Sequence, residues 1–302
     1  MKSFNSLSTE RKGEIIILSE GWLWGLFPVI TAMTYLSLPP LVSLGFATLF
    51  SSLVFLFLFI WNKRWPELKD GEALKDIFLV ALINGALYYI LYFIGLKYST
   101  SGNVSLVALM EIFFSYLYFQ VWQKEYFSVK YLWGSLLMLL GAVIILLPKS
   151  SGWYAGDLLI LAAAATGPAG NYFQKRARKK VSTETILLLR CIVSVPAIFL
   201  TANLFGEVLA WTDIKNSLPT LLLNGVVLLG LSKIFWIEGI HRLSITKAIA
   251  LSSVSPLFTL VFAYFLLGNI PTVWQLSSFV PLFFGLILLT SKNPEKELSL
   301  EP

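Results

Sequence analysis

The chain of 302 residues is 57% hydrophobic and only 13% charged, and its formal net charge is +6. Soluble domains carry about 25% charged residues, and a soluble protein of this size could not bury so much apolar surface. The composition therefore excludes an ordinary soluble protein and indicates that lipid surrounds most of the chain. The basic residues lie in short segments between apolar runs, which favours a membrane protein over a nucleic-acid-binding one.

The predicted elements begin with a polar segment, residues 1–13, which lacks the features of a cleavable signal and is expected to be a cytoplasmic tail. A membrane helix needs about 20 mostly apolar residues, and long runs without alternation favour helices over barrel strands. An all-α membrane protein of ten transmembrane helices is predicted, with spans at 14–35, 41–61, 75–95, 103–122, 130–147, 156–174, 184–205, 218–240, 245–267 and 272–290. Residues 291–302 form a second predicted tail.

The distribution of Lys and Arg predicts the orientation of these spans. If the N-terminus is cytoplasmic, only Lys97, Lys149 and Lys215 of the 23 basic residues fall in loops on the far side, while Arg190 and Lys233 fall within spans. Cytoplasmic loops are rich in basic residues, so both termini are predicted to be cytoplasmic. The run QKRARKK at 174–180 is expected to anchor a helix end at the anionic inner leaflet.

The chain also resembles itself when it is shifted by 144 residues, because Gly95 then aligns with Gly239 and Gly141 with Gly285. Two units of five spans each are predicted, over 14–147 and 156–290. An odd number of spans turns the second unit upside down in the membrane. Inverted repeats are typical of secondary transporters, whose substrate site lies near the midplane between the halves.

Three motifs carry a resemblance to the EamA-type, ten-helix members of the drug/metabolite transporter superfamily. LWG at 23–25 is similar to the family's first-helix Trp-Gly, LLLR at 187–190 to its second-helix arginine, and 239–289 to the closing helices of a repeat. The resemblance implies a bacterial inner-membrane carrier that moves small metabolites, often amino acids, by alternating access. The first half departs from the second at Glu111, which stands where the second half has Ser255, and this leaves the substrate class open.

Four ionisable residues lie well inside the predicted spans: Glu20, Glu111, Arg190 and Lys233. Such residues are costly in a bilayer and mark pathways or paired sites. Salt bridges among Glu20, Arg190, Lys233 and Glu238 in the inner half are one alternative. Glu111 has no cation at its level except Lys97 near the helix end, and it lies roughly 12 Å below the outer helix end, so it is predicted to face a cavity or a partner.

We predict a central cavity lined by aromatic, charged and hydroxyl side chains: Trp24, Tyr88, Tyr92, Glu111, Ser115, Arg190, Lys233, Trp236, Ser252 and Ser255. Arg190 or Lys233 would meet a carboxylate, and the aromatic walls would hold an apolar or cationic moiety. The predicted substrate is therefore amino-acid-like, with Glu111 and Glu20 as candidate proton or cation sites.

The sequence also limits other functions. No P-loop and no metalloprotease or hydrolase motif occurs, so we expect no enzyme activity, no cofactor and no metal. A proton is the candidate coupling ion, and no nucleic-acid partner is expected. The alternatives are a cation or multidrug exporter and, in a different class, a non-transporting receptor or scaffold. The sequence leaves open whether the protein is a monomer or a homodimer.

Overall fold

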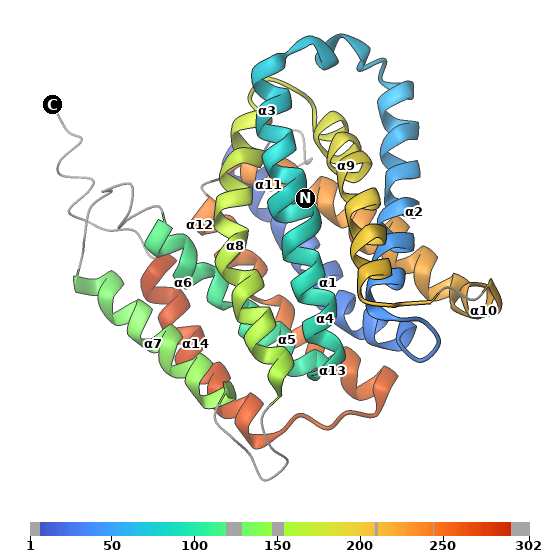
Figure 1. The fold of residues 1–302 in the computed structure, drawn as a ribbon. Helices are drawn as coiled ribbons and strands as arrows, with labels where there is room; N and C mark the ends of the chain where they lie inside the picture. Colours follow the sequence, from blue (N-terminus) through green and yellow to red (C-terminus); the bar gives the residue numbers. More distant parts are fainter. Residues whose placement is uncertain (1–6, 119–128, 147–153, 209–210, 244, 291–302) are drawn as a thin grey trace, which may run out of the picture.

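The computed structural model describes residues 7–118, 129–146, 154–208, 211–243 and 245–290, and every regular element in these ranges is helical (Figure 1). The first half contains α1 (Thr9–Thr34), α2 (Pro40–Trp61), η2 (Trp65–Lys69), α3 (Gly71–Val80), η3 (Ala81–Leu87), α4 (Tyr88–Lys97), α5 (Ser101–Ala108), α6 (Met110–Tyr116) and α7 (Val129–Leu146). The second contains α8 (Ala155–Ala177), α9 (Thr183–Leu204), α10 (Trp211–Leu222), η5 (Leu223–Leu231), α11 (Ser232–Arg242), α12 (Ile245–Ser252), α13 (Ser255–Leu267) and α14 (Val273–Thr290).

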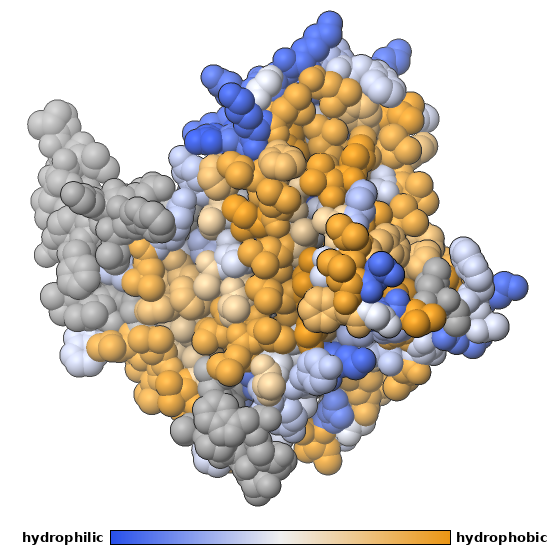
Figure 2. All heavy atoms as spheres, viewed as in Figure 1, coloured by the Kyte–Doolittle hydropathy of each residue, from blue (hydrophilic) through white to orange (hydrophobic). Residues whose placement is uncertain are grey.

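Five continuous helical runs are long and apolar enough to cross a membrane: Thr9–Thr34, Pro40–Trp61, Gly71–Lys97, Thr183–Leu204 and Trp211–Arg242. Figure 2 shows a broad apolar surface in the middle of the visible face, with hydrophilic residues gathered above it. We call the end that carries the turns 62–70 and 178–182 the basic end, and the end that carries the turns 35–39 and 98–100 the opposite end. This apolar belt is what a lipid environment requires.

Two predicted spans are broken rather than continuous. In the span predicted at 103–122, α5 ends at Ala108 and α6 begins at Met110; in that at 245–267, α12 ends at Ser252 and α13 begins at Ser255. Pro256 was expected inside a helix but lies in the first turn of α13, where its missing N–H costs no hydrogen bond. Both breaks lie near the middle of a span.

Two other spans contain π-helical turns, which the sequence pattern did not predict. The segments η3 and η5 interrupt the helical runs 71–97 and 211–242. A π turn carries an extra residue, so it shifts the face that the following turns present, and such turns are frequent at functional sites. The second run also begins earlier than predicted, so that Lys215 lies in α10 and not in a loop.

The packing of the helices joins the two halves closely. Helix α1 packs against α11, α12 and α13 of the second half, and α8 packs against α4, α5 and α6 of the first. Helix α2 pairs with α9, and α7 lies beside α14 at one edge of the molecule (Figure 1). Small residues permit these contacts, since a Cβ on Gly156 would lie 2.0 Å from the carbonyl oxygen of Gly95.

Candidate functional site

A polar cavity of about 90 Å³ lies between the two halves, and the broken helices and one π segment contribute to its wall. Water needs about 10–15 Å³ by this measure, so several waters or a small solute can enter. The lining residues are Glu20, Trp24, Pro28, Asn84, Tyr88, Tyr89, Tyr92, Ser105, Ala108, Leu109, Glu111, Gly167, Asn171, Gln174, Arg190, Lys233, Trp236, Ile249, Ser252, Ser253, Ser255 and Thr259. Among the predicted site residues, only Ser115 is missing from this wall.

Ser115 lies outside the wall of this cavity. It lies on α6 one turn beyond Glu111, toward the basic end, and its side chain is fully buried. One helical turn is about 5.4 Å, which places the hydroxyl past the wall of so small a cavity. Helical spacing gave the correct face of α6 but could not show where along the helix the cavity ends.

Glu20 and Lys233 form a buried ion pair in the cavity wall. The Lys233 Nζ lies 3.5 Å from a carboxylate oxygen of Glu20, and the Ser252 hydroxyl donates to the other oxygen at 2.8 Å. The same ammonium lies 3.4 Å from the centre of the Trp24 ring, a cation–π arrangement. Lys233 therefore has partners within the protein, and the alternative of inner-half pairing holds for Glu20 and Lys233.

Glu111 is bound by amides rather than by a cation. The Asn171 side-chain amide donates to it at 2.7 Å, and the carbonyl oxygen of the Asn171 side chain accepts from Asn84 at 3.1 Å and from the Trp236 indole at 3.2 Å. In the part of the chain that the structure describes, no basic side chain forms an ion pair with Glu111. Its direct hydrogen-bond partner among the described residues is thus a neutral amide, and Lys233 faces it without forming an ion pair.

Arg190 faces the cavity without a carboxylate partner in the described ranges. It is only 6% exposed and projects from α9. Gly85 makes this approach possible, because a Cβ there would lie 2.9 Å from the Arg190 Cγ and 2.0 Å from the Ser194 hydroxyl. A buried guanidinium is costly unless an anion joins it, so Arg190 is a candidate anion contact.

Aromatic rings form the remaining wall, toward the opposite end. Trp24 stacks on Phe27 with ring centroids 4.3 Å apart, and Tyr88 stacks on Tyr92 at 6.0 Å. Tyr89 also lines the cavity. Charged, amide and aromatic side chains therefore share the cavity wall, as is common in small-molecule sites.

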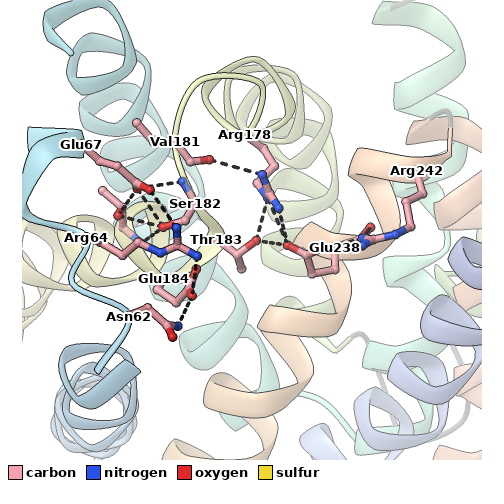
Figure 3. A network of polar contacts seen from close by, with 11 residues as sticks. Asn62, Arg64, Glu67, Arg178, Val181, Ser182, Thr183, Glu184, Glu238 and Arg242 are labelled. Atoms are coloured by element: carbon pink, nitrogen blue, oxygen red, sulfur yellow. Dashed lines mark hydrogen bonds and ion pairs between the residues drawn. The ribbon is translucent and has the colours of Figure 1, made fainter. Parts of the chain in front are cut away.

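A polar network joins helix ends and turns at the basic end (Figure 3). Glu238 does not pair with Arg190 but with Arg178 at 2.9 Å and Arg242 at 2.5 Å, and the Thr183 hydroxyl donates to it. Glu67 accepts from the backbone amide and hydroxyl of Ser182, both at 2.8 Å. These contacts include links between the two halves of the chain.

Glu67 shows how this network acts on a loop carboxylate. Burial alone would raise the pKa of Glu67, but hydrogen bonds from Thr185 and Ser182, together with the nearby Arg64, hold the pKa below its ordinary value. Glu67 is therefore ionised in the network at neutral pH.

The contacts between helices differ in chemistry at the two ends. At the basic end Lys247 of α12 pairs with Glu14 of α1 at 2.7 Å. At the opposite end the Asn103 amide of α5 donates to Asp157 of α8 at 2.9 Å, and Glu207 accepts from the backbone amides of Leu41 and Val42, each at 2.9 Å. In the described residues, the ion pairs other than Lys233–Glu20 all lie toward the basic end.

The sequence interpretation missed Asn171 and Gln174 of α8. Both lie within the predicted span 156–174, and amides in a membrane helix are a signal that could have found them. Asn84 also lines the cavity and was not among the predicted site residues. No group of three or more His, Cys, Asp or Glu in the described ranges could hold a metal ion.

The sequence matches the EamA-like transporter family twice, over residues 11–147 and 154–291. Among Bacillus subtilis proteins, the uncharacterized transporter YoaV is 24% identical over 82% of this chain and 86% of its own length, and YvbV is 23% identical over 90% and 89%. The uncharacterized transporter YdfC is 34% identical, but over 43% of this chain and 42% of its own length. A solved crystal structure with 18% identity superposes with a TM-score of 0.72 over 93% of this chain and 97% of that chain, which shows a shared fold. With both halves matched, the chain belongs to the EamA-like transporter family.

Proposed function

We propose that this protein is a secondary transporter of the bacterial inner membrane that moves a small amino-acid-like metabolite. The observation that carries the proposal is the pair of uncompensated groups in one cavity. Arg190 offers a cation without a carboxylate partner, and Glu111 offers a carboxylate without a cation partner, in the residues that the structure describes. A solute with both an ammonium and a carboxylate group complements the two.

The mechanism we propose is alternating access between two inverted five-helix repeats, 14–147 and 156–290. The matched irregularities support it. Shifted by 144 residues, the separation of Gly95 and Gly239, α4 falls on α11, α7 on α14, and the break at Leu109 on that at Ser253. Shared breaks and π segments at equivalent positions are expected of a duplicated unit, and discontinuous helices at the repeat interface are typical of carriers.

The proposed placement has ten crossings, with both termini cytoplasmic. The basic end carries Lys63, Arg64, Lys179 and Lys180 in its turns, as cytoplasmic loops do. Transport rather than catalysis is proposed, with a proton as the coupling ion and Glu111 as its site. The groups that face Glu111 are Asn171, Lys233, Glu20 and Tyr88.

A cation or multidrug exporter is the second candidate. The aromatic wall and the two carboxylates Glu20 and Glu111 favour it. However, Lys233 already neutralises Glu20 and covers the Trp24 ring, which leaves less of the cavity for a bulky cation. A non-transporting scaffold would not require a polar cavity between the halves.

Transport by the purified protein in proteoliposomes tests the proposal. A panel of radiolabelled amino acids and simple organic cations is offered at several pH values, with and without a pH gradient. We expect uptake or counterflow of an amino acid, strongly reduced by Arg190→Gln, and a pH dependence that Glu111→Gln flattens. Glu72→Gln serves as the control, because Glu72 lies exposed at the basic end, away from the cavity. Transport of organic cations alone would favour the second candidate, and an unchanged pH profile in Glu111→Gln would remove its proton role.

A further inference from the structure

The amides beside Glu111 have a fixed orientation. The Trp236 indole N–H can only donate, so the Asn171 atom that it contacts at 3.2 Å is the carbonyl oxygen. The Asn171 nitrogen must then face Glu111, which it contacts at 2.7 Å. By the same logic the Asn84 atom that contacts the Asn171 oxygen at 3.1 Å is nitrogen. One indole thus sets the direction of the whole chain of hydrogen bonds and turns the Asn84 oxygen away from it.

This arrangement leaves acceptors without donors. The Asn84 Oδ1 and the Gln174 Oε1 are both buried and accept no hydrogen bond in the part of the chain that is described. Gln174 is only 1% exposed, and both residues line the cavity together with Glu111. A buried acceptor without a donor costs about 1–3 kcal/mol, so two of them beside a carboxylate indicate that a donor-rich group belongs there.

Glycines on α8 let two of these side chains approach the helix closely. A Cβ on Gly167 would lie 2.6 Å from the Glu111 carboxyl carbon, and one on Gly170 would lie 2.1 Å from the Asn84 Oδ1. Gly167, Gly170 and Gln174 follow one another at helical spacing. Glu111 and Asn84 therefore contact the face of α8 that also carries Gln174.

We propose that Glu111, Asn84 and Gln174 form a subsite for a primary ammonium group, which they recognise through its N–H donors. A primary ammonium has three donors for these acceptors, whereas a quaternary ammonium has none. Quaternary groups are usually held by aromatic faces, but Lys233 already covers the Trp24 ring. This inference rests on the proposed function, because it takes the cavity to be the substrate site. It adds that the two amide side chains distinguish unmethylated from methylated amines.

A binding experiment tests the subsite without requiring transport. The purified protein in detergent is titrated with n-butylammonium chloride and with N,N,N-trimethylbutylammonium chloride, and the shift of its thermal unfolding is recorded. We expect n-butylammonium to act at about tenfold lower concentration, as one charge-assisted hydrogen bond would give. Equal potency of the two amines would overturn the proposal.

Substitutions test which side chains cause the preference for n-butylammonium. Asn84→Leu and Gln174→Met each remove an acceptor at nearly constant side-chain size. Each variant should weaken the binding of n-butylammonium severalfold and leave the binding of the trimethyl compound unchanged. The matched control is Asn224→Leu, because Asn224 is also fully buried with an oxygen that accepts no hydrogen bond but lies outside the cavity wall. An equal loss of preference in Asn224→Leu would contradict the assignment. If a variant does not fold, the comparison of the two amines on the unsubstituted protein still decides.

The subsite and the proposed function fail separately. An absence of amino-acid transport with an intact preference for n-butylammonium would count against the proposed substrate and support the subsite. Amino-acid transport that is insensitive to N-methylation of the substrate would support the proposed function and overturn the subsite.

Discussion

Glu20 and Glu111 are two carboxylates in one cavity, and the structure compensates them in opposite ways. Glu20 has Lys233 at 3.5 Å and a hydroxyl donor, Ser252, at 2.8 Å. Glu111 has one amide donor, Asn171, at 2.7 Å. A carboxylate that is paired with a cation of the protein itself has a structural role. A carboxylate held by a neutral donor can still bind a proton or a ligand cation without breaking an ion pair.

Glu111 also marks a difference between the two halves of the chain. Glu111 stands where the second half has Ser255, at equivalent positions just after the helix breaks. The breaks are common to both halves and the carboxylate is not. The shape of the cavity wall is therefore a shared property, and its chemistry is particular to one side.

Removing the cation of the paired carboxylate should have the largest effect. Lys233→Met leaves the charge of Glu20 buried and unpaired, which costs about 3–5 kcal/mol in comparable cases. We expect a large drop in the thermal unfolding temperature in detergent, and recovery of most of it in the double variant Glu20→Gln/Lys233→Met. If the single variant is as stable as the unsubstituted protein, the ion pair is not structural. Lys180→Met provides the control, since its partner Glu72 is exposed and such pairs contribute about 0–1 kcal/mol.

Glu67 is a third carboxylate, and it lies in a turn at the basic end. Glu67 is held by Ser182 and Thr185 with its pKa below the ordinary value of 4.5. Its contribution to stability is thus complete above that value and is lost as the pH falls through the lower, folded-state pKa. Glu67→Gln should cost about 1 kcal/mol at neutral pH, and this difference should shrink only below about pH 4.5. Unfolding of both proteins between pH 7 and pH 3 measures it, and a difference that is constant over the whole range would contradict the assignment.

The smallest effect on stability is expected for the unpaired carboxylate. Glu111→Gln retains an oxygen that can accept from Asn171 and removes a charge that has no ion-pair partner in the described residues. We expect its free energy of unfolding to change by less than about 1 kcal/mol, while its transport loses pH dependence. A loss of stability as large as that of Lys233→Met would show that the two carboxylates contribute equally to stability and would contradict this prediction.

The sequence predicted the membrane character, the helical runs and most of the cavity wall, because charge and hydropathy are properties of single positions. It named Glu20 and Glu238 as possible partners of Lys233 but could not choose between them, since both choices depend on packing and Glu20 lies far away in the sequence. The π segments were also hidden, because one extra residue in a helix leaves no mark in an apolar run. Gln174 was missed because it lies where the basic run 174–180 begins, and that run was interpreted as an anchor.

The uneven distribution of ion pairs between the two ends has a consequence for the solution around the protein. Charges separated in water are screened over about 10 Å at 0.1 M salt and about 3 Å at 1 M. Lys247 with Glu14, and Arg178 with Glu238, are exposed in part to this screening. The hydrogen bond from the neutral Asn103 amide to Asp157 is buried and is less exposed to this screening. Raising the ionic strength should therefore weaken the ion pairs at the basic end more than the hydrogen bond between Asn103 and Asp157 at the opposite end.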